Sequence, residues 1–140
     1  MNIKRAFSAG ALTYIASLIV GIILAFIFDA DATTSPHPVL WIIGMLGPIV
    51  FAWIFATWYF RAHVSQGRGQ GFVLGLIMLV VGFILDTITV LPAAKGFDNA
   101  IAYLGEFYSQ WTFWITAILV VGVCVLVGGN VREVSSRVEE

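Results

Sequence analysis

Three long stretches of this chain contain no Asp, Glu, Lys or Arg: residues 6–28, 32–60 and 107–131. A helix needs about 20 apolar residues to cross the hydrocarbon core of a bilayer, and each stretch is long enough. A fourth stretch, from about 70 to 91, is interrupted only by Asp86. Its Leu, Ile, Val and Phe residues favour insertion by roughly 4–8 kcal/mol, which outweighs a cost of about 3 kcal/mol for one Asp. The predicted spans are approximately 6–28, 39–60, 70–91 and 107–131.

The composition agrees with a membrane protein. Of 140 residues, 60% are hydrophobic and only 11% are charged, whereas about a quarter of the residues in a soluble domain are charged. The loops between the predicted spans are short, so successive helices should run in opposite directions. The sequence therefore predicts an all-α fold, an integral membrane four-helix bundle of up-and-down topology, with residues 1–140 as a single transmembrane domain.

The basic residues indicate the orientation. In this topology six of the seven Lys and Arg residues fall on one side of the membrane: Lys4, Arg5, Arg61, Arg68, Arg132 and Arg137. Because basic residues near helix ends stay on the cytoplasmic side, both termini should be cytoplasmic, in a membrane of bacterial type. The net charge of −1 and the dispersed basic residues argue against a nucleic-acid partner. Membrane lipids are the expected partners of Arg61, His63 and Arg68.

The N-terminal stretch has a second interpretation. A cleavable signal peptide has a basic region, an apolar core and a cleavage site with small residues, in that order. The same order appears here in Lys4 and Arg5, the apolar run and Ala30-Asp31-Ala32. A mature chain would then start near Thr33. The apolar core of a signal peptide is usually about 7–15 residues long. The uncharged run of residues 6–28 is 23 positions long and favours a retained helix.

The first predicted span carries small residues at a spacing of four: Ala9, Thr13, Ser17, Gly21 and Ala25. This spacing places them in one stripe along the helix, where another backbone can approach closely. The stripe predicts a helix-packing surface. Its partner is either another helix of the same chain or a second protein, in a homo-oligomer or with a larger membrane protein.

Asp86 is the only ionisable residue expected inside the membrane boundary. Gly71, Gly75 and Gly82 precede it by 15, 11 and 4 residues, which are close to whole helical turns, and Thr89 continues the same face. A face of glycines should pack against protein, so Gly75 and Gly82 are predicted helix-packing positions. Asp86 and Thr89 then form a candidate intramembrane polar site, inside the bundle or in a small outward-facing aqueous pocket.

Two interpretations of Asp86 follow. A carboxylate isolated in the membrane can act as a proton or cation site, because its protonation can be coupled to ligand occupancy. Alternatively it is a structural acid that bonds to Thr hydroxyls or reaches Lys95 in the next loop.

Residues 97–108 predict an amphipathic surface helix before the last span. Phe97, Ile101, Leu104 and Tyr108 recur at steps of three or four residues, and polar residues from Asp98 onward fall on the other side. Such a helix suits the outer membrane interface, and Trp111 and Trp114 suit its aromatic belt. A docking surface for another membrane protein is the alternative.

The sequence shows no recognisable catalytic or cofactor motif. His37 and His63 fall on opposite sides of the membrane in this topology, so they cannot share a haem or a metal ion. The glycines at 67, 69 and 71 follow a span and lack the Lys-Ser/Thr ending of a phosphate-binding loop. We therefore expect no cofactor, no metal and no enzymatic activity. The leading expectation is a membrane protein of accessory or structural type; the alternative is a small oligomeric transporter or channel that uses Asp86.

Overall fold

The structure is a computed structural model that describes residues 2–27, 38–61, 67–93 and 97–138. Within these residues it contains helices and no strands. The helices are α1 (Ile3–Ile27), α2 (Pro38–Phe60), α3 (Arg68–Ala93), α4 (Phe97–Ser109) and α5 (Trp111–Val138). The chain is all-α, as predicted.

Three of the helices are long and apolar enough to cross a membrane. The qualifying segments are Ile3–Leu24 in α1, Arg68–Val90 in α3 and Trp111–Asn130 in α5. α2 contributes a shorter apolar segment, Gly44–Phe60. These lengths support a membrane protein, because a hydrocarbon core favours helices whose backbone hydrogen bonds are all internal.

The last long helix begins later than the predicted boundary at residue 107. Residues 107–109 form the last turn of α4 rather than the start of a span, and Gln110 separates α4 from α5. The Gln110 N–H bonds to the Phe107 carbonyl and the Phe113 N–H bonds to the Gln110 carbonyl, both at 3.2 Å. The Ser109 hydroxyl also donates to the Glu106 carbonyl at 2.7 Å. Together these bonds end α4 and start α5 in a new direction.

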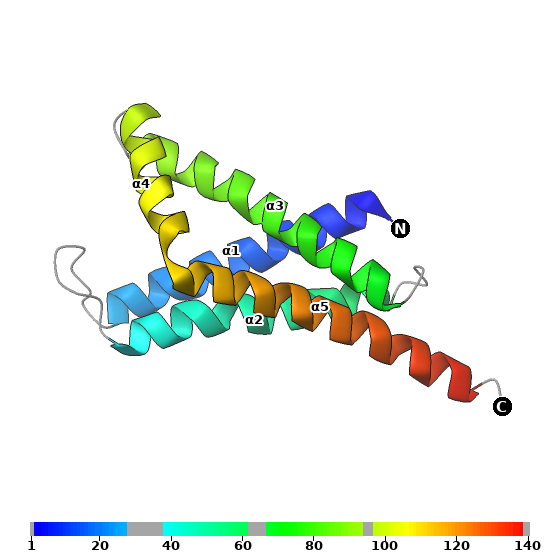
Figure 1. Cartoon of the computed structure of the whole chain (residues 1–140). Coiled ribbons are helices and arrows are strands. Elements are labelled where there is room, and N and C mark those ends of the chain that lie inside the picture. Colours follow the sequence, from blue (N-terminus) through cyan, green and yellow to red (C-terminus); the bar gives the residue numbers. More distant parts are fainter. Residues whose placement is uncertain (1, 28–37, 62–66, 94–96, 139–140) are drawn as a thin grey trace.

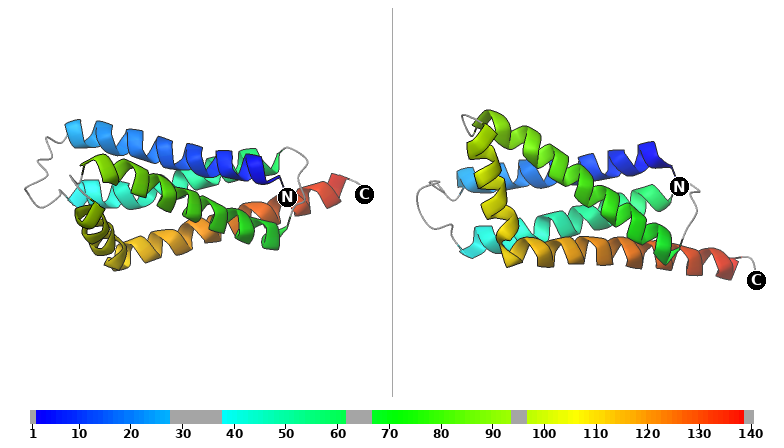
Figure 2. Two further views of the ribbon diagram at one scale, coloured as in Figure 1. Left: turned by 90° about the horizontal axis from the view of Figure 1, so that it is seen from above. Right: turned by 45° about the horizontal axis from the view of Figure 1, so that its top comes forward.

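The four long helices lie side by side (Figure 1). α1 packs against α2 and α3, and α5 packs against the same two helices. α4 connects the far ends of α3 and α5 and runs across the long helices, as two further views show (Figure 2). α4 is thus the only described helix that does not follow the common direction.

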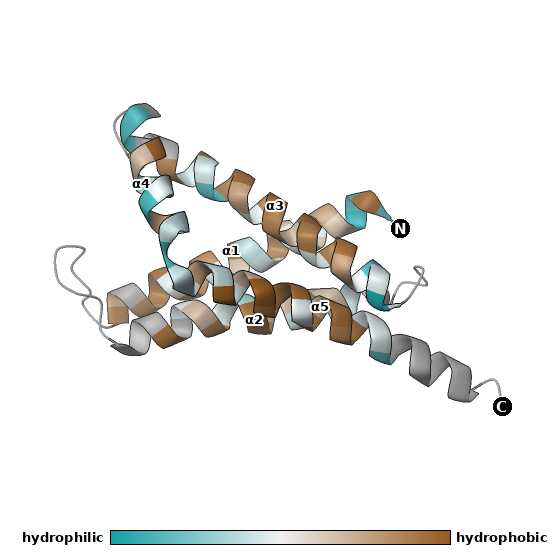
Figure 3. Cartoon of the chain, viewed as in Figure 1, coloured by the Kyte–Doolittle hydropathy of each residue, from teal (hydrophilic) through white to brown (hydrophobic). Residues whose placement is uncertain are grey.

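The two ends of this arrangement differ in charge. We call one the basic end: there α1 and α3 begin and α2 ends, with Lys4, Arg5, Arg61 and Arg68. The other is the α4 end, where α4 carries Asp98 and Glu106. Polar residues lie toward both ends, and the helices between them consist mostly of apolar residues (Figure 3).

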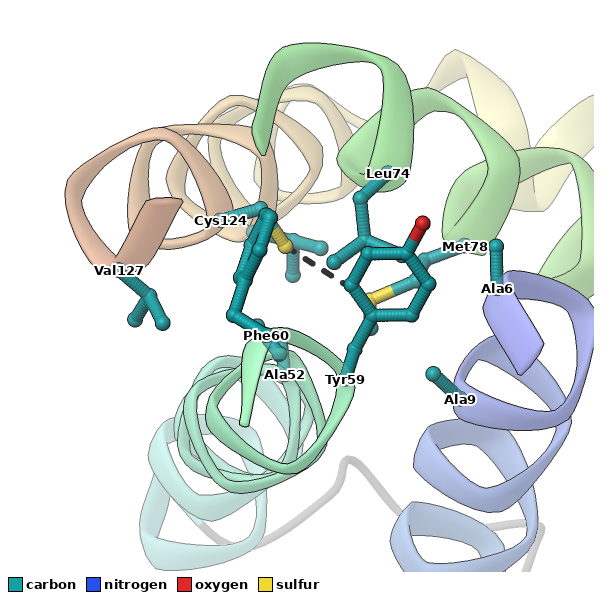
Figure 4. Packing of buried hydrophobic residues seen from close by; sticks show 11 residues of the cluster. Ala6, Ala9, Ala52, Tyr59, Phe60, Leu74, Met78, Cys124 and Val127 are labelled. Carbon is teal, nitrogen blue, oxygen red and sulfur yellow. Dashed lines mark hydrogen bonds between the residues drawn. The ribbon is translucent and has the colours of Figure 1, made fainter. Parts of the chain in front are cut away.

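The packed core lies in the half of the molecule next to the basic end. Its members come from all four long helices: Ala6, Ala9, Ala52, Ala56, Tyr59, Phe60, Leu74, Met78, Val120, Cys124 and Val127. Figure 4 shows Tyr59, Leu74 and Met78 meeting between α1, α2 and α3. Large apolar side chains also face outward along the helices, up to the α4 end, where Phe26 is 83% exposed and Ile88 is 57% exposed.

Glycines allow α3 and α5 to approach closely in this half. A Cβ atom at Gly75 would lie 2.9 Å from the Cα of Val121, and one at Gly71 would overlap the Cys124 carbonyl oxygen. Gly67, which precedes α3, has a φ of 137° and bonds through its N–H to the Gly128 carbonyl at 3.0 Å. Only glycine adopts such a φ without strain.

Candidate functional site

The Asp86 carboxylate has one hydrogen-bond donor from another helix. The Tyr108 hydroxyl of α4 donates to its Oδ2 at 2.8 Å. Both side chains are half-buried. A bond to an ionised acceptor is stronger than one between neutral groups, so this contact ties α4 to α3.

A second bond joins α1 to α3 beside the first. The Tyr14 hydroxyl lies 2.9 Å from the Thr89 Oγ1. Thr89 can also donate to carbonyls of α3, at 2.9 Å from Leu85 and 3.0 Å from Asp86. Either hydroxyl can donate in the contact between the two side chains. Tyr14 is also an electrostatic neighbour of the Asp86 carboxyl group.

Tyr14, Asp86, Thr89 and Tyr108 form one group, which we call the polar cluster. They come from α1, α3 and α4 and lie outside the packed core. In a segment with little access to water such groups satisfy each other, because a polar atom left without a partner is costly there.

Aromatic rings surround the Tyr108 side chain. Its ring centroid is 4.6 Å from that of Phe113 and 5.2 Å from that of Phe83, and the Trp114 indole N–H donates to the Tyr108 carbonyl at 3.0 Å. Burial raises the pKa of Tyr108 above its ordinary value, and the hydrogen bond to Asp86 raises it further. The phenol therefore stays protonated, and stays a donor, at neutral pH.

The chemistry of the polar cluster is limited to one carboxyl group and three hydroxyls. In the part of the chain that the structure describes, no three His, Cys, Asp or Glu side chains are grouped so that they could hold a metal ion. One carboxylate with hydroxyl neighbours can bind a proton or a monovalent cation, or it can act as an acceptor that positions α4.

The predicted site residues Asp86 and Thr89 lie in this cluster, but Thr89 does not bond to the carboxylate. Its partners are Tyr14 and two backbone carbonyls. Lys95, the other expected partner of Asp86, lies outside the described residues. Among the described residues, Tyr108 is the side-chain hydrogen-bond partner of the carboxylate.

The predicted helix-packing residues divide into two groups. Gly75 is in close contact with α5, whereas the Cβ positions of Gly21 and Gly82 meet no described atom within 4 Å. Ser17 is half-buried and its hydroxyl donates to the Thr13 carbonyl at 2.8 Å. The side chain of Ala25 lies outside the described residues.

Sequence reasoning missed Tyr14 as a cluster member and assigned Tyr108 only to the apolar face of a surface helix. Tyr14 is a signal in itself, since a phenol within a span needs a hydrogen-bond partner. Tyr108 carried no comparable signal, because its contact with Asp86, 22 residues earlier, depends on how α4 crosses the bundle. The segment 97–108 does form a helix, within α4.

Comparison of the chain with protein-family models, with curated proteins and with solved structures finds no match in any of the three.

Proposed function

We infer that this chain is a multi-pass integral membrane protein of accessory or structural type, without enzymatic activity of its own. Its four long helices form a transmembrane bundle in a cytoplasmic membrane of bacterial type, with both termini on the cytoplasmic side. The basic end faces the cytoplasm, in line with the retention of Lys and Arg on that side. α4 then lies at the outer interface.

The small-residue stripe of α1 is the observation that carries this proposal. Ala9 and Thr13, near the basic end, are buried within the chain, whereas Gly21 of the same stripe is exposed and meets no described neighbour. Close packing of small residues is a main source of helix association in lipid. The open Gly21 position suits a helix of another chain.

The test is recovery of the protein from its own membrane within native lipid nanodiscs, followed by native mass spectrometry. We expect a stoichiometric complex, which Gly21→Leu should reduce about tenfold or more because the new side chain prevents close approach. The matched control is Ile22→Leu, on the neighbouring exposed position. A monomer in wild type, or equal loss in both variants, would contradict the association through this stripe.

The second candidate is a small oligomeric transporter or channel with Asp86 as its proton or cation site. It is supported by the half-buried carboxyl group and its three hydroxyl-bearing neighbours. An acid inside a membrane segment is costly and often functional.

Flux assays on the protein alone in proteoliposomes separate the two candidates. A transporter should move protons or a monovalent cation, and Asp86→Asn should remove that flux. Asp98→Asn changes an exposed acid of α4 and should leave the flux unchanged. No flux in wild type, or equal flux in Asp86→Asn, would exclude the transporter.

A further inference from the structure

The basic end holds one guanidinium group in a fixed position. Arg5, in the first turns of α1, donates through Nη2 to the Trp58 carbonyl at 2.7 Å. Its guanidinium carbon lies 3.9 Å from the centre of the Trp58 ring. Stacking on an aromatic face and a bond to the last turn of α2 together hold the cation in place.

The buried side of this cation has unused hydrogen-bonding groups. Among the described residues, the Arg5 Nε and the Tyr59 hydroxyl are buried and have no hydrogen-bond partner. Tyr59 is 0% exposed, and its hydroxyl faces the Asn2 backbone and Arg5. Both atoms are closed to solvent, so a further partner of the guanidinium must meet the N–H groups on its open side.

The charges nearby favour an anion as that partner. Lys4, Arg61 and Arg68 lie at the same end, whereas the acids whose side chains are described belong to α3 and α4 beyond the core: Asp86, Asp98 and Glu106. The start of α1 adds the positive end of a helix dipole, which favours anions.

The surface beside Arg5 is apolar. Leu12 of α1, two turns after Arg5 on the same face, is 41% exposed, and Ile54, one turn before Trp58 on α2, is 49% exposed. Hydrocarbon chains can lie along these side chains while the attached head group meets the guanidinium. This combination is typical of lipid rather than of free phosphate.

We propose that the basic end binds an anionic phospholipid, with its phosphate group on the Arg5 guanidinium and the start of α1, and its acyl chains along α1 and α2. Arg5 is the principal ligand, because its planar fork of N–H groups fits two phosphate oxygens.

The test uses the full chain in phosphatidylcholine nanodiscs that contain a small fraction of phosphatidylglycerol, with lipid retention read by native mass spectrometry. Wild type should retain phosphatidylglycerol preferentially. Arg5→Gln should reduce that preference about tenfold, whereas Lys4→Gln, which removes one charge from the same turn, should reduce it less than about threefold. Inorganic phosphate should not displace the lipid.

Three results would overturn the proposal. They are no preference in wild type, equal losses in Arg5→Gln and Lys4→Gln, and displacement by inorganic phosphate, which would identify a free anion as the ligand. If Arg5→Gln does not fold, Arg5→Lys tests the proposal instead, because it keeps the charge but removes the guanidinium. Full preference in Arg5→Lys would mean that diffuse charge suffices, and a clear loss would support the guanidinium site.

Discussion

At the scale of single residues, the Tyr108 hydroxyl is the described hydrogen-bond donor to the Asp86 carboxylate. A half-buried carboxylate with a hydrogen-bond donor from another helix is held in place and holds that helix in return. Its bond joins residues separated by 22 positions in sequence. The polar cluster is therefore a tertiary contact whatever further role Asp86 has.

A double-mutant cycle should measure this contact. Asp86→Ala and Tyr108→Phe should each lower the free energy of unfolding in mixed micelles, with a coupling energy of about 1–2 kcal/mol between them. Thr87→Val is the matched control, because the Thr87 hydroxyl bonds to the Phe83 carbonyl of its own helix at 2.9 Å. Its coupling to Tyr108→Phe should stay below about 0.5 kcal/mol. Additive effects of the first pair would mean that the hydrogen bond contributes nothing.

The raised pKa of Tyr108 predicts a dependence on alkaline pH. The unfolded phenol ionises at about pH 10, before the folded one, so unfolding releases a proton above that pH. The stabilisation by Tyr108 is complete below about pH 10 and is lost as the pH rises toward the pKa of the folded state. The difference in stability between wild type and Tyr108→Phe, measured from melting curves, should shrink as the pH rises from about 10 to 12. A constant difference across this range would contradict the pKa shift.

At the scale of helices, glycine positions separate close contacts from open ones. Gly75 brings α3 against Val121 of α5, whereas Gly82, two turns later on the same helix, faces open space among the described residues. The two glycines belong to the same helix but differ in their neighbours. They form a natural pair for a test of interhelical packing.

Gly75→Ala should lower the free energy of unfolding by about 1–3 kcal/mol, because the added Cβ would lie 2.9 Å from the Cα of Val121 and the backbone must shift. Gly82→Ala should be neutral or stabilising by up to about 1 kcal/mol, since Ala favours a helix over Gly. Both are measured by the same micelle unfolding. Equal destabilisation by both would show that the α3–α5 contact does not decide the outcome.

α4 shows how a helix predicted as a surface element gains a structural role. Its amphipathic pattern predicted the helix itself, because apolar residues recur with the helical period. The pattern did not predict that Tyr108 would turn toward Asp86. The turn at Gln110, which sets the direction of α4, depends on hydrogen bonds between backbone groups of both helices.

At the scale of the whole molecule, charge and packing are distributed unevenly between the two ends. Among the described side chains, the basic end has the core and four basic residues, whereas the α4 end has the polar cluster and the acidic residues. A membrane protein with this asymmetry should have a single orientation, set by the basic residues.

Cysteine labelling should verify that orientation. In a Cys124→Ala background, which removes the buried native thiol, Glu106→Cys should react with a membrane-impermeant maleimide in intact cells. Arg61→Cys should react only after permeabilisation. Both positions are exposed, so access to the reagent depends on the side of the membrane. The reverse pattern would invert the proposed topology, and labelling of both in intact cells would exclude a single orientation.

The sequence by itself determined that the chain is all-helical, with long apolar helices and short connections. In a hydrocarbon environment a backbone polar group can form hydrogen bonds only within its own helix. A long run without charged residues therefore predicts a helix. The sequence also predicted two packing faces, because both follow the helical period. They are the stripe that begins with Ala9 and Thr13 and the glycine face that includes Gly75.

Only the tertiary structure decided which of these faces are filled. Gly75 meets α5 while Gly82 and Gly21 meet no described neighbour, although all three have the same residue type. The partner of Asp86 is Tyr108 because α4 crosses between α3 and α5. Helical period fixes which residues share a face, but the contact between two faces depends on the directions of separate helices, which short-range preferences do not specify.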